Sequence, residues 1–217
     1  MPAARLQLNA PKDKQVTAQQ EVKFDFTVSN FTLGAASPGA EAIDLAQSEK
    51  GQHIHLIVDN GPYSAHYQSK FSKTFAPGTH YALAFLSRSY HLSLKNPEAY
   101  QAFQFTVEEA MANEPKLYPL NEPMLFYSRP KGTYSGAEAQ ELLFDFYLIN
   151  ADLAPDGYSV LATINGTTTF EIDEWIPFTL SGLPMGENTI TLELVDAQGR
   201  PVNASVNRIS RTFTLKS

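Results

Sequence analysis

The chain contains nearly the same pattern twice, and this internal repeat constrains the fold more than any other feature. Phe24-Asp25-Phe26 near the start of the first copy recurs as Phe144-Asp145-Phe146 in the second. Phe105-Thr106-Val107 ends the first copy, and Phe213-Thr214-Leu215 ends the second. A repeat of this length is a whole domain and not one unit of a solenoid. The 217 residues therefore predict two domains of ordinary size.

Hydrophobic and polar residues alternate within each copy. Val22–Val28 in the first copy and Leu142–Leu148 in the second place an apolar residue at every other position. A period of two indicates a β-strand with one buried face. Turn signals such as Pro77-Gly78 and Asn165-Gly166 separate short strands of this kind. We predict an all-β fold of two tandem immunoglobulin/fibronectin-III-like antiparallel β-sandwiches.

Domain boundaries follow from the repeat and from proline. We predict a first sandwich over residues 1–110, a Pro-rich linker over 111–123 and a second sandwich over 124–217. The two copies differ most after Leu33, where the first copy has an additional segment, 34–50, rich in alanine, glycine and serine. This insert is either a tolerated surface insertion or a loop that covers or lines a site.

Charge and composition exclude several functions. The net charge of −7, without a basic run, argues against nucleic acid or an anionic membrane as a partner. The absence of cysteine excludes disulfides, thiolate metal sites and cysteine nucleophiles. No apolar run approaches the roughly 20 residues of a membrane-spanning helix, so no transmembrane segment is expected. The sequence has no G-x-S-x-G, H-E-x-x-H, phosphate-loop or dinucleotide motif. We therefore predict that the chain is not an enzyme, and a hydrolase is the least favoured alternative.

The strand that begins near Gln52 has an unusual outer face. Alignment of the two copies points Ile54 and Leu56 toward the core, so that His53 and His55 lie on the opposite face with Ile57. Imidazole is the commonest metal ligand in proteins, and two histidines at i and i+2 of a strand can share one ion.

A hairpin signal follows this strand. If Asn60-Gly61 forms a two-residue turn, His55 pairs directly with His66 on the next strand. His53, His55 and His66 then form a triangle on one face. A one-residue slip in the turn would move His66 to the other face, so this triangle depends on the turn type.

The neighbouring strand extends the same face with apolar residues. After Pro77-Gly78 the alignment turns Tyr81, Leu83 and Phe85 outward, where the second copy has threonine and glutamate. An outward apolar patch of this kind usually covers something. Three interpretations remain open: packing of the second domain or of the 34–50 insert, a surface for an unknown protein or small ligand, and a zinc or copper site.

A second cluster, Ser87-Arg88-Ser89-Tyr90-His91, follows the Phe85 strand. The end of that strand lies near the start of the histidine strand in an immunoglobulin-like sandwich, so Arg88 and His91 can approach His53. The cluster is either a polar loop that satisfies its own hydrogen bonds or a corner that recognises an anion through Arg88. The candidate ligand-binding residues are therefore His53, His55, His66, Tyr81, Phe85, Arg88 and His91.

The segments Gly51–Asn60 and Ala84–His91, together with Asp145–Leu148 and Gly182–Asn188 of the second copy, resemble a group of uncharacterised exported bacterial proteins with tandem immunoglobulin-like domains. The resemblance covers nearly the whole chain and implies a periplasmic or outer cell-envelope location, often through a lipid anchor that lies outside this sequence. It brings no activity and no catalytic residues. The expected signal peptide is not part of this sequence either.

These observations favour a non-enzymatic binding or scaffolding protein of a bacterial cell envelope that uses the outer sheet face of the first domain. No cofactor is expected for that role. The alternative is a metal-binding protein with zinc or copper held by His53, His55 and either His66 or His91.

Overall fold

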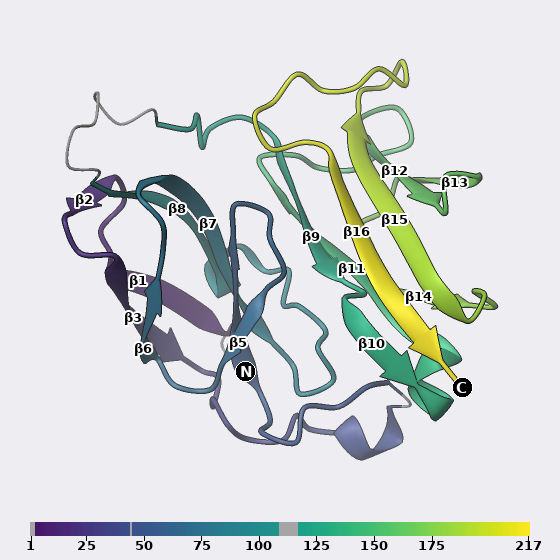
Figure 1. The fold of residues 1–217 in the computed structure, drawn as a ribbon, viewed down its shortest axis with the longest axis horizontal. Coiled ribbons are helices and arrows are strands. Elements are labelled where there is room, and N and C mark those ends of the chain that lie inside the picture. The colour runs from purple at the N-terminus through teal and green to yellow at the C-terminus, as the bar shows by residue number, and fades with distance from the viewer. Residues whose placement is uncertain (1–2, 44, 109–116) are drawn as a thin grey trace. The chain divides into compact units, whose positions relative to one another are not determined.

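The computed structural model describes residues 3–43, 45–108 and 117–217 and divides the chain into two compact units, Met1–Pro119 and Leu120–Ser217. The division falls within the expected 111–123 linker, of which residues 111–116 lie outside the described part. Each unit is a β-sandwich of two packed layers of strands (Figure 1). The predicted all-β fold of two tandem sandwiches is confirmed.

The described residues of the first domain form eight strands and two short 3₁₀ helices. The strands are β1 (Arg5–Ala10), β2 (Gln15–Thr17), β3 (Glu21–Ser29), β4 (His53–Val58), β5 (Ser64–His66), β6 (Lys70–Thr74), β7 (Gly78–Ser87) and β8 (Tyr100–Val107). The 3₁₀ helices are η1 (Ala40–Ala42), inside the 34–50 insert, and η2 (Pro97–Ala99).

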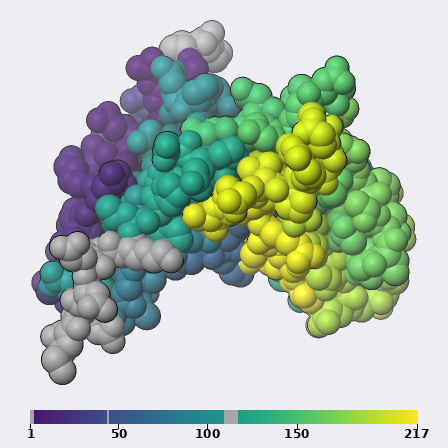
Figure 2. Space-filling model, turned by 90° about the horizontal axis from the view of Figure 1, so that it is seen from above, coloured from purple at the N-terminus to yellow at the C-terminus, as the bar shows by residue number. Residues whose placement is uncertain are grey.

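The second domain repeats this series of strands. Its described residues form β9 (Met124–Arg129), β10 (Gly132–Ser135), β11 (Glu141–Ile149), β12 (Ser159–Ile164), β13 (Thr168–Ile172), β14 (Phe178–Ser181), β15 (Gly186–Val195) and β16 (Ile209–Lys216), with the 3₁₀ helix η3 (Gly136–Ala139). The C-terminal residues, drawn in yellow, lie at the surface of this domain in Figure 2.

The two domains share one sheet topology. In the first domain, a sheet of order β1-β3-β6 packs on a sheet of order β2-β8-β7-β4-β5. In the second, the corresponding orders are β9-β11-β14 and β10-β16-β15-β12-β13. One pair in each domain is parallel, β2 with β8 and β10 with β16, which departs from the expected antiparallel pattern. These short strands follow directly after β1 and β9 and join the opposite sheet, so they run beside the last strand of their domain in the same direction.

The core of the first domain confirms which residues of β4 and β7 point inward. Ile54 and Leu56 of β4 pack with Ala82, Ala84 and Leu86 of β7. The complete cluster of buried residues is Leu6, Val22, Phe24, Phe26, Ile54, Leu56, Ala82, Ala84, Leu86, Ala99, Phe103, Phe105 and Val107. Since strand residues alternate between faces, His53, His55 and Phe85 lie on the opposite face of this sheet.

Candidate metal site

Three histidines meet on the outer face of β4. Possible ligand atoms of His53, His55 and His91 all lie within 4.8 Å of one another. The Nε2 atoms of His53 and His55 are 2.7 Å apart, and the ring of His91 lies 5.1 Å from that of His53 and 5.8 Å from that of His55. His53 and His55 have 0 % exposed surface, and His91 is partly buried. Among the described residues this is the one such group of potential metal ligands.

The hydrogen bonds of His53 define the tautomers of the pair. Its Nδ1 lies 2.8 Å from the carbonyl oxygen of Gly51, which can only accept, so Nδ1 of His53 bears the proton. In a neutral His53 the Nε2 atom then holds a lone pair and accepts the Nε2–H of His55. This geometry directs the Nε2 lone pair of His53 at His55, and removal of the proton between them would free that lone pair for a metal ion.

His91 reaches the cluster from a tight turn after β7. The His91 N–H donates to the Arg88 carbonyl at 2.9 Å, and the Arg88 N–H donates to the Leu92 carbonyl at 2.9 Å. His91 has a φ of 66°, in the left-handed region, where residues other than glycine are uncommon and asparagine, aspartate and histidine are the most frequent of them. This backbone conformation turns the imidazole of His91 toward His53.

The 34–50 insert of the first domain supports this turn. The Ser48 N–H donates to the Ser89 carbonyl at 2.7 Å, and the Ser89 N–H donates to Ser37 Oγ at 2.9 Å. Ser48 Oγ also lies 2.7 Å from the hydroxyl of Tyr67, whose ring lies 5.1 Å from that of His53. The insert therefore packs against the turn that carries His91.

Aromatic rings surround the histidines. Tyr63 stacks on His55 with ring centroids 3.6 Å apart, and the edge of Phe85 meets His55 at 5.1 Å. Tyr63 and Phe85 are buried, and Tyr67 is partly buried beside His53. These rings separate the imidazoles of His53 and His55 from bulk water.

The predicted pairing of His55 with His66 is wrong. His55 pairs with Ala65, and His66 pairs with Ile54, on the core side of the sheet. The reason is the turn: Asp59 and Asn60 have φ values of 53° and 51°, and the Gly61 N–H donates to the Val58 carbonyl. The pairing continues from Leu56 with Ser64 and so sets Val58 opposite Pro62. The loop therefore has three residues, Asp59–Gly61, instead of the expected two, and the additional residue moves His66 to the other face.

His66 consequently has a separate environment. Its ring stacks on Phe71 at 3.4 Å, and its Nε2 lies 2.8 Å from Ser64 Oγ. Burial, with smaller contributions from the positive charge of Lys73 and from His53, lowers the pKa of His66 from 6.5 to about 4. His66 is not part of the group formed by His53, His55 and His91.

This low pKa predicts a loss of stability in mild acid. The unfolded chain takes up a proton at His66 near pH 6.5 and the folded chain only near pH 4, so His66 contributes its full stabilisation above pH 6.5 and loses it as the pH falls to 4. We expect a loss of about 1–2 kcal/mol after allowance for its partial exposure. Urea denaturation between pH 7 and pH 4 measures it, and His66→Phe, which keeps the stacking on Phe71, should flatten this part of the profile. A variant profile parallel to the wild type would contradict the prediction.

The remaining predicted site residues lie around the cluster in different ways. Arg88 donates to Gln52 Oε1 at 3.1 Å and lies over the ring of Phe31, so its guanidinium takes part in an internal contact. Tyr81 lies beside Tyr118 with centroids 4.6 Å apart, and burial raises the pKa of its hydroxyl to about 12. The structure thus brings His53, His55, His91 and Phe85 together, and it places Arg88 in contact with Gln52.

Sequence reasoning missed three residues that shape the site: Gly51, Tyr63 and Tyr67. Gly51 has a φ of 80°, and its carbonyl orients His53. Tyr63 and Tyr67 flank β5, which pairs with β4, and that proximity to His55 is the signal that could have identified them.

Comparisons with known proteins give structural likenesses at low similarity. No protein-family description and no curated protein sequence matches the chain. Among solved structures, the fibronectin(III)-like modules of Clostridium thermocellum CbhA share 12% identity over 97% of this chain and 94% of that chain, with a TM-score of 0.33. SGBP-B of the Bacteroides ovatus mixed-linkage glucan utilization locus, in complex with a heptasaccharide, shares 11% identity over 99% of this chain and 71% of that chain, with a TM-score of 0.30. No family follows from likenesses at these TM-scores.

Helices that could cross a membrane are absent from the described residues, in which only short 3₁₀ helices occur.

Proposed function

We propose that the chain is a non-enzymatic metal-binding protein whose first domain holds a zinc or copper ion through His53, His55 and His91. Export to a bacterial cell envelope is part of this proposal and rests on the sequence resemblance. The supporting observation is the convergence of three imidazoles, two of them fully buried, with ligand atoms within 4.8 Å of one another.

The spacing of His53 and His55 needs only a small adjustment to accept an ion. Ligand nitrogens lie about 2.0–2.1 Å from zinc, so two of them on one ion are roughly 3.4 Å apart. The Nε2 atoms of His53 and His55 are 2.7 Å apart, so the rings must separate by less than ~1 Å. The proton that His55 shares with His53 then moves to Nδ1 of His55, and both rings stay neutral.

The alternative role as a docking surface for a macromolecule has weaker support. That role needs the outward apolar side chains of β4 and β7 to be accessible, whereas Ile57, Leu83 and Phe85 are buried in the structure. Tyr81 is partly buried and lies against Tyr118. On this face, the three histidines are the residues whose chemistry indicates one kind of ligand, a metal ion.

Calorimetric titration of the metal-stripped full chain with zinc and with copper tests the proposal. We expect submicromolar binding of one ion, weakened at least 100-fold in His53→Ala/His55→Ala, because two of the three imidazole ligands are lost. His91→Asn should also weaken binding, and it suits the left-handed φ at this position, so its fold is retained.

His80→Gln is the matched control. His80 Nδ1 lies 2.6 Å from Asp59 Oδ2, and His80 is not a member of the cluster, so the affinity should stay within about twofold of the wild type. Equal binding by the wild type and the double variant, or no binding by either, would refute the proposed function.

A further inference from the structure

The donor set of the cluster differs from that of most sites for divalent ions. The group of possible ligands around His53 consists of three imidazoles, and within the described residues no aspartate or glutamate joins it. The sequence has no cysteine, so a thiolate cannot complete the set. An ion bound here therefore keeps its whole charge, because neutral imidazole donates electron pairs without cancelling charge.

Because the site is largely buried, the charge of the ion affects how tightly it can bind. His53 and His55 have no exposed surface, and Tyr63, Tyr67 and Phe85 pack their rings around them. The free-energy cost of moving an ion from water into a medium of low dielectric constant grows with the square of its charge. A monovalent ion is therefore much less penalised at this site than a divalent one.

The number of available ligands also favours a monovalent ion. Zinc held by three protein ligands normally takes water as its fourth, and Cu(II) favours a tetragonal arrangement of nitrogen and oxygen donors. Stacking of Tyr63 on His55 at 3.6 Å leaves little space for water beside that ring. Imidazole is among the ligands that copper accepts, and a Cu(I) ion held by the three imidazoles needs no additional water ligand.

We propose that the cluster of His53, His55 and His91 selects Cu(I) over both Cu(II) and Zn(II). This inference rests on the proposed function, since it names the ion and oxidation state that the same site takes. The selectivity arises from three neutral donors, two of which are buried among aromatic rings.

The test compares three ions on the full chain. The metal-stripped protein is titrated anaerobically with Cu(I) in competition with a chromophoric Cu(I) chelator, and separately with Cu(II) and with Zn(II) against chelators of known affinity. We expect Cu(I) to bind at least 100-fold more tightly than either divalent ion. Since a tenfold ratio corresponds to 59 mV for one electron, the potential of bound copper should lie about 120 mV or more above that of aqueous copper.

The outcomes separate the two proposals. Tighter binding of Zn(II) or Cu(II) than of Cu(I), abolished in His53→Ala/His55→Ala, would overturn the selectivity and leave the metal site standing. Binding of none of the three ions, or equal binding by the double variant, would overturn both.

Tyr63→Ala gives an independent check of the enclosure. This variant removes the ring that stacks on His55 and keeps all three imidazoles, so water can reach the ion. We expect the ratio of Cu(I) to Zn(II) affinity to fall at least tenfold, with Zn(II) affinity maintained or increased. An unchanged ratio in a variant whose circular dichroism matches the wild type would overturn the role of the enclosure.

Discussion

Gly51→Ala should destabilise the first domain by about 3 kcal/mol or more and should weaken metal binding as well. Gly51 has a φ of 80°, and a Cβ at this position would lie 2.4 Å from the carbonyl oxygen of Ala35. The obstructing atom belongs to the backbone, and the Gln52 N–H donates to the same oxygen at 2.7 Å, so it cannot move aside without breaking that hydrogen bond. Urea denaturation followed by circular dichroism measures the loss.

Gly39→Ala separates the free-energy cost of the steric clash from the cost of placing alanine in the left-handed region. Gly39 has a φ of 73°, and a Cβ there meets nothing within 4 Å, so this variant has only the cost of a left-handed alanine, about 1 kcal/mol. The difference between the two variants is the effect of the contact with Ala35. Equal losses in both would show that the backbone at Gly51 adapts and that the close approach is unimportant.

The effect on metal binding follows from the carbonyl of Gly51. That oxygen accepts the Nδ1–H of His53 at 2.8 Å and so fixes the ring whose Nε2 faces His55. Displacement of the backbone at Gly51 removes this orientation, and we expect the affinity for the ion to fall about tenfold. Gly39→Ala should bind as the wild type does.

The internal repeat explains how far the fold could be predicted. Because two copies of one domain were present, each strand could be compared with its counterpart, and the inward residues Ile54, Leu56, Ala82, Ala84 and Leu86 followed from that alignment. The parallel pairs β2–β8 and β10–β16 were not predicted, since a strand of three or four residues has too little alternation to reveal its partner.

The face of His66 was predicted wrongly because the local turn signal gave the wrong loop length. Asn-Gly is the strongest signal for a two-residue hairpin, but the register of β4 and β5 leaves three residues, Asp59–Gly61, in the loop. The second copy has the same loop length: Ile164, the counterpart of Val58, pairs with Thr168 across the three residues 165–167. In both copies the two left-handed residues, Asp59-Asn60 and Asn165-Gly166, directly follow the strand.

The third histidine depended on tertiary structure. The sequence predicted that the turn with His91 lies near the start of the histidine strand. Whether the ring reaches His53 depends on the left-handed φ of His91. It also depends on the contacts of Ser48 and Ser37 with Ser89. These contacts join positions far apart in the sequence, and no local pattern encodes them.

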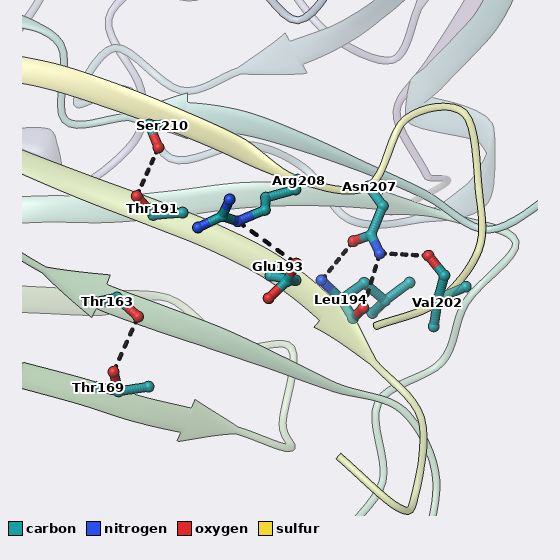
Figure 3. A network of polar contacts seen from close by, with 9 residues as sticks. All are labelled: Thr163, Thr169, Thr191, Glu193, Leu194, Val202, Asn207, Arg208 and Ser210. Carbon is teal, nitrogen blue, oxygen red and sulfur yellow. Dashed lines mark hydrogen bonds and ion pairs between the residues drawn. The ribbon is translucent and has the colours of Figure 1, made fainter. Parts of the chain in front are cut away.

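The second large loss of stability is expected in the second domain, at the buried Asn207, whose side chain holds a loop in place by hydrogen bonds. Asn207 donates from Nδ2 to the carbonyls of Leu194 and Val202, at 3.0 and 2.6 Å, and accepts the Leu194 N–H on Oδ1 at 2.6 Å (Figure 3). Its side chain thereby joins the end of β15 to the segment that leads into β16. With only 8 % exposure, water cannot easily replace these contacts.

Asn207→Ala should therefore cost about 3 kcal/mol, because three hydrogen bonds are lost and the buried Leu194 N–H loses the acceptor that Asn207 supplies. The sole tryptophan, Trp175, lies in the same domain, so its fluorescence during urea denaturation reports the loss directly. Thr191→Val is the matched control: the hydroxyl of Thr191 lies 2.6 Å from Ser210 Oγ on the exposed face of the same sheet, where water replaces it, and we expect a loss below ~0.5 kcal/mol (Figure 3). If both variants lost the same small amount, burial of Asn207 would not be what makes its hydrogen bonds important.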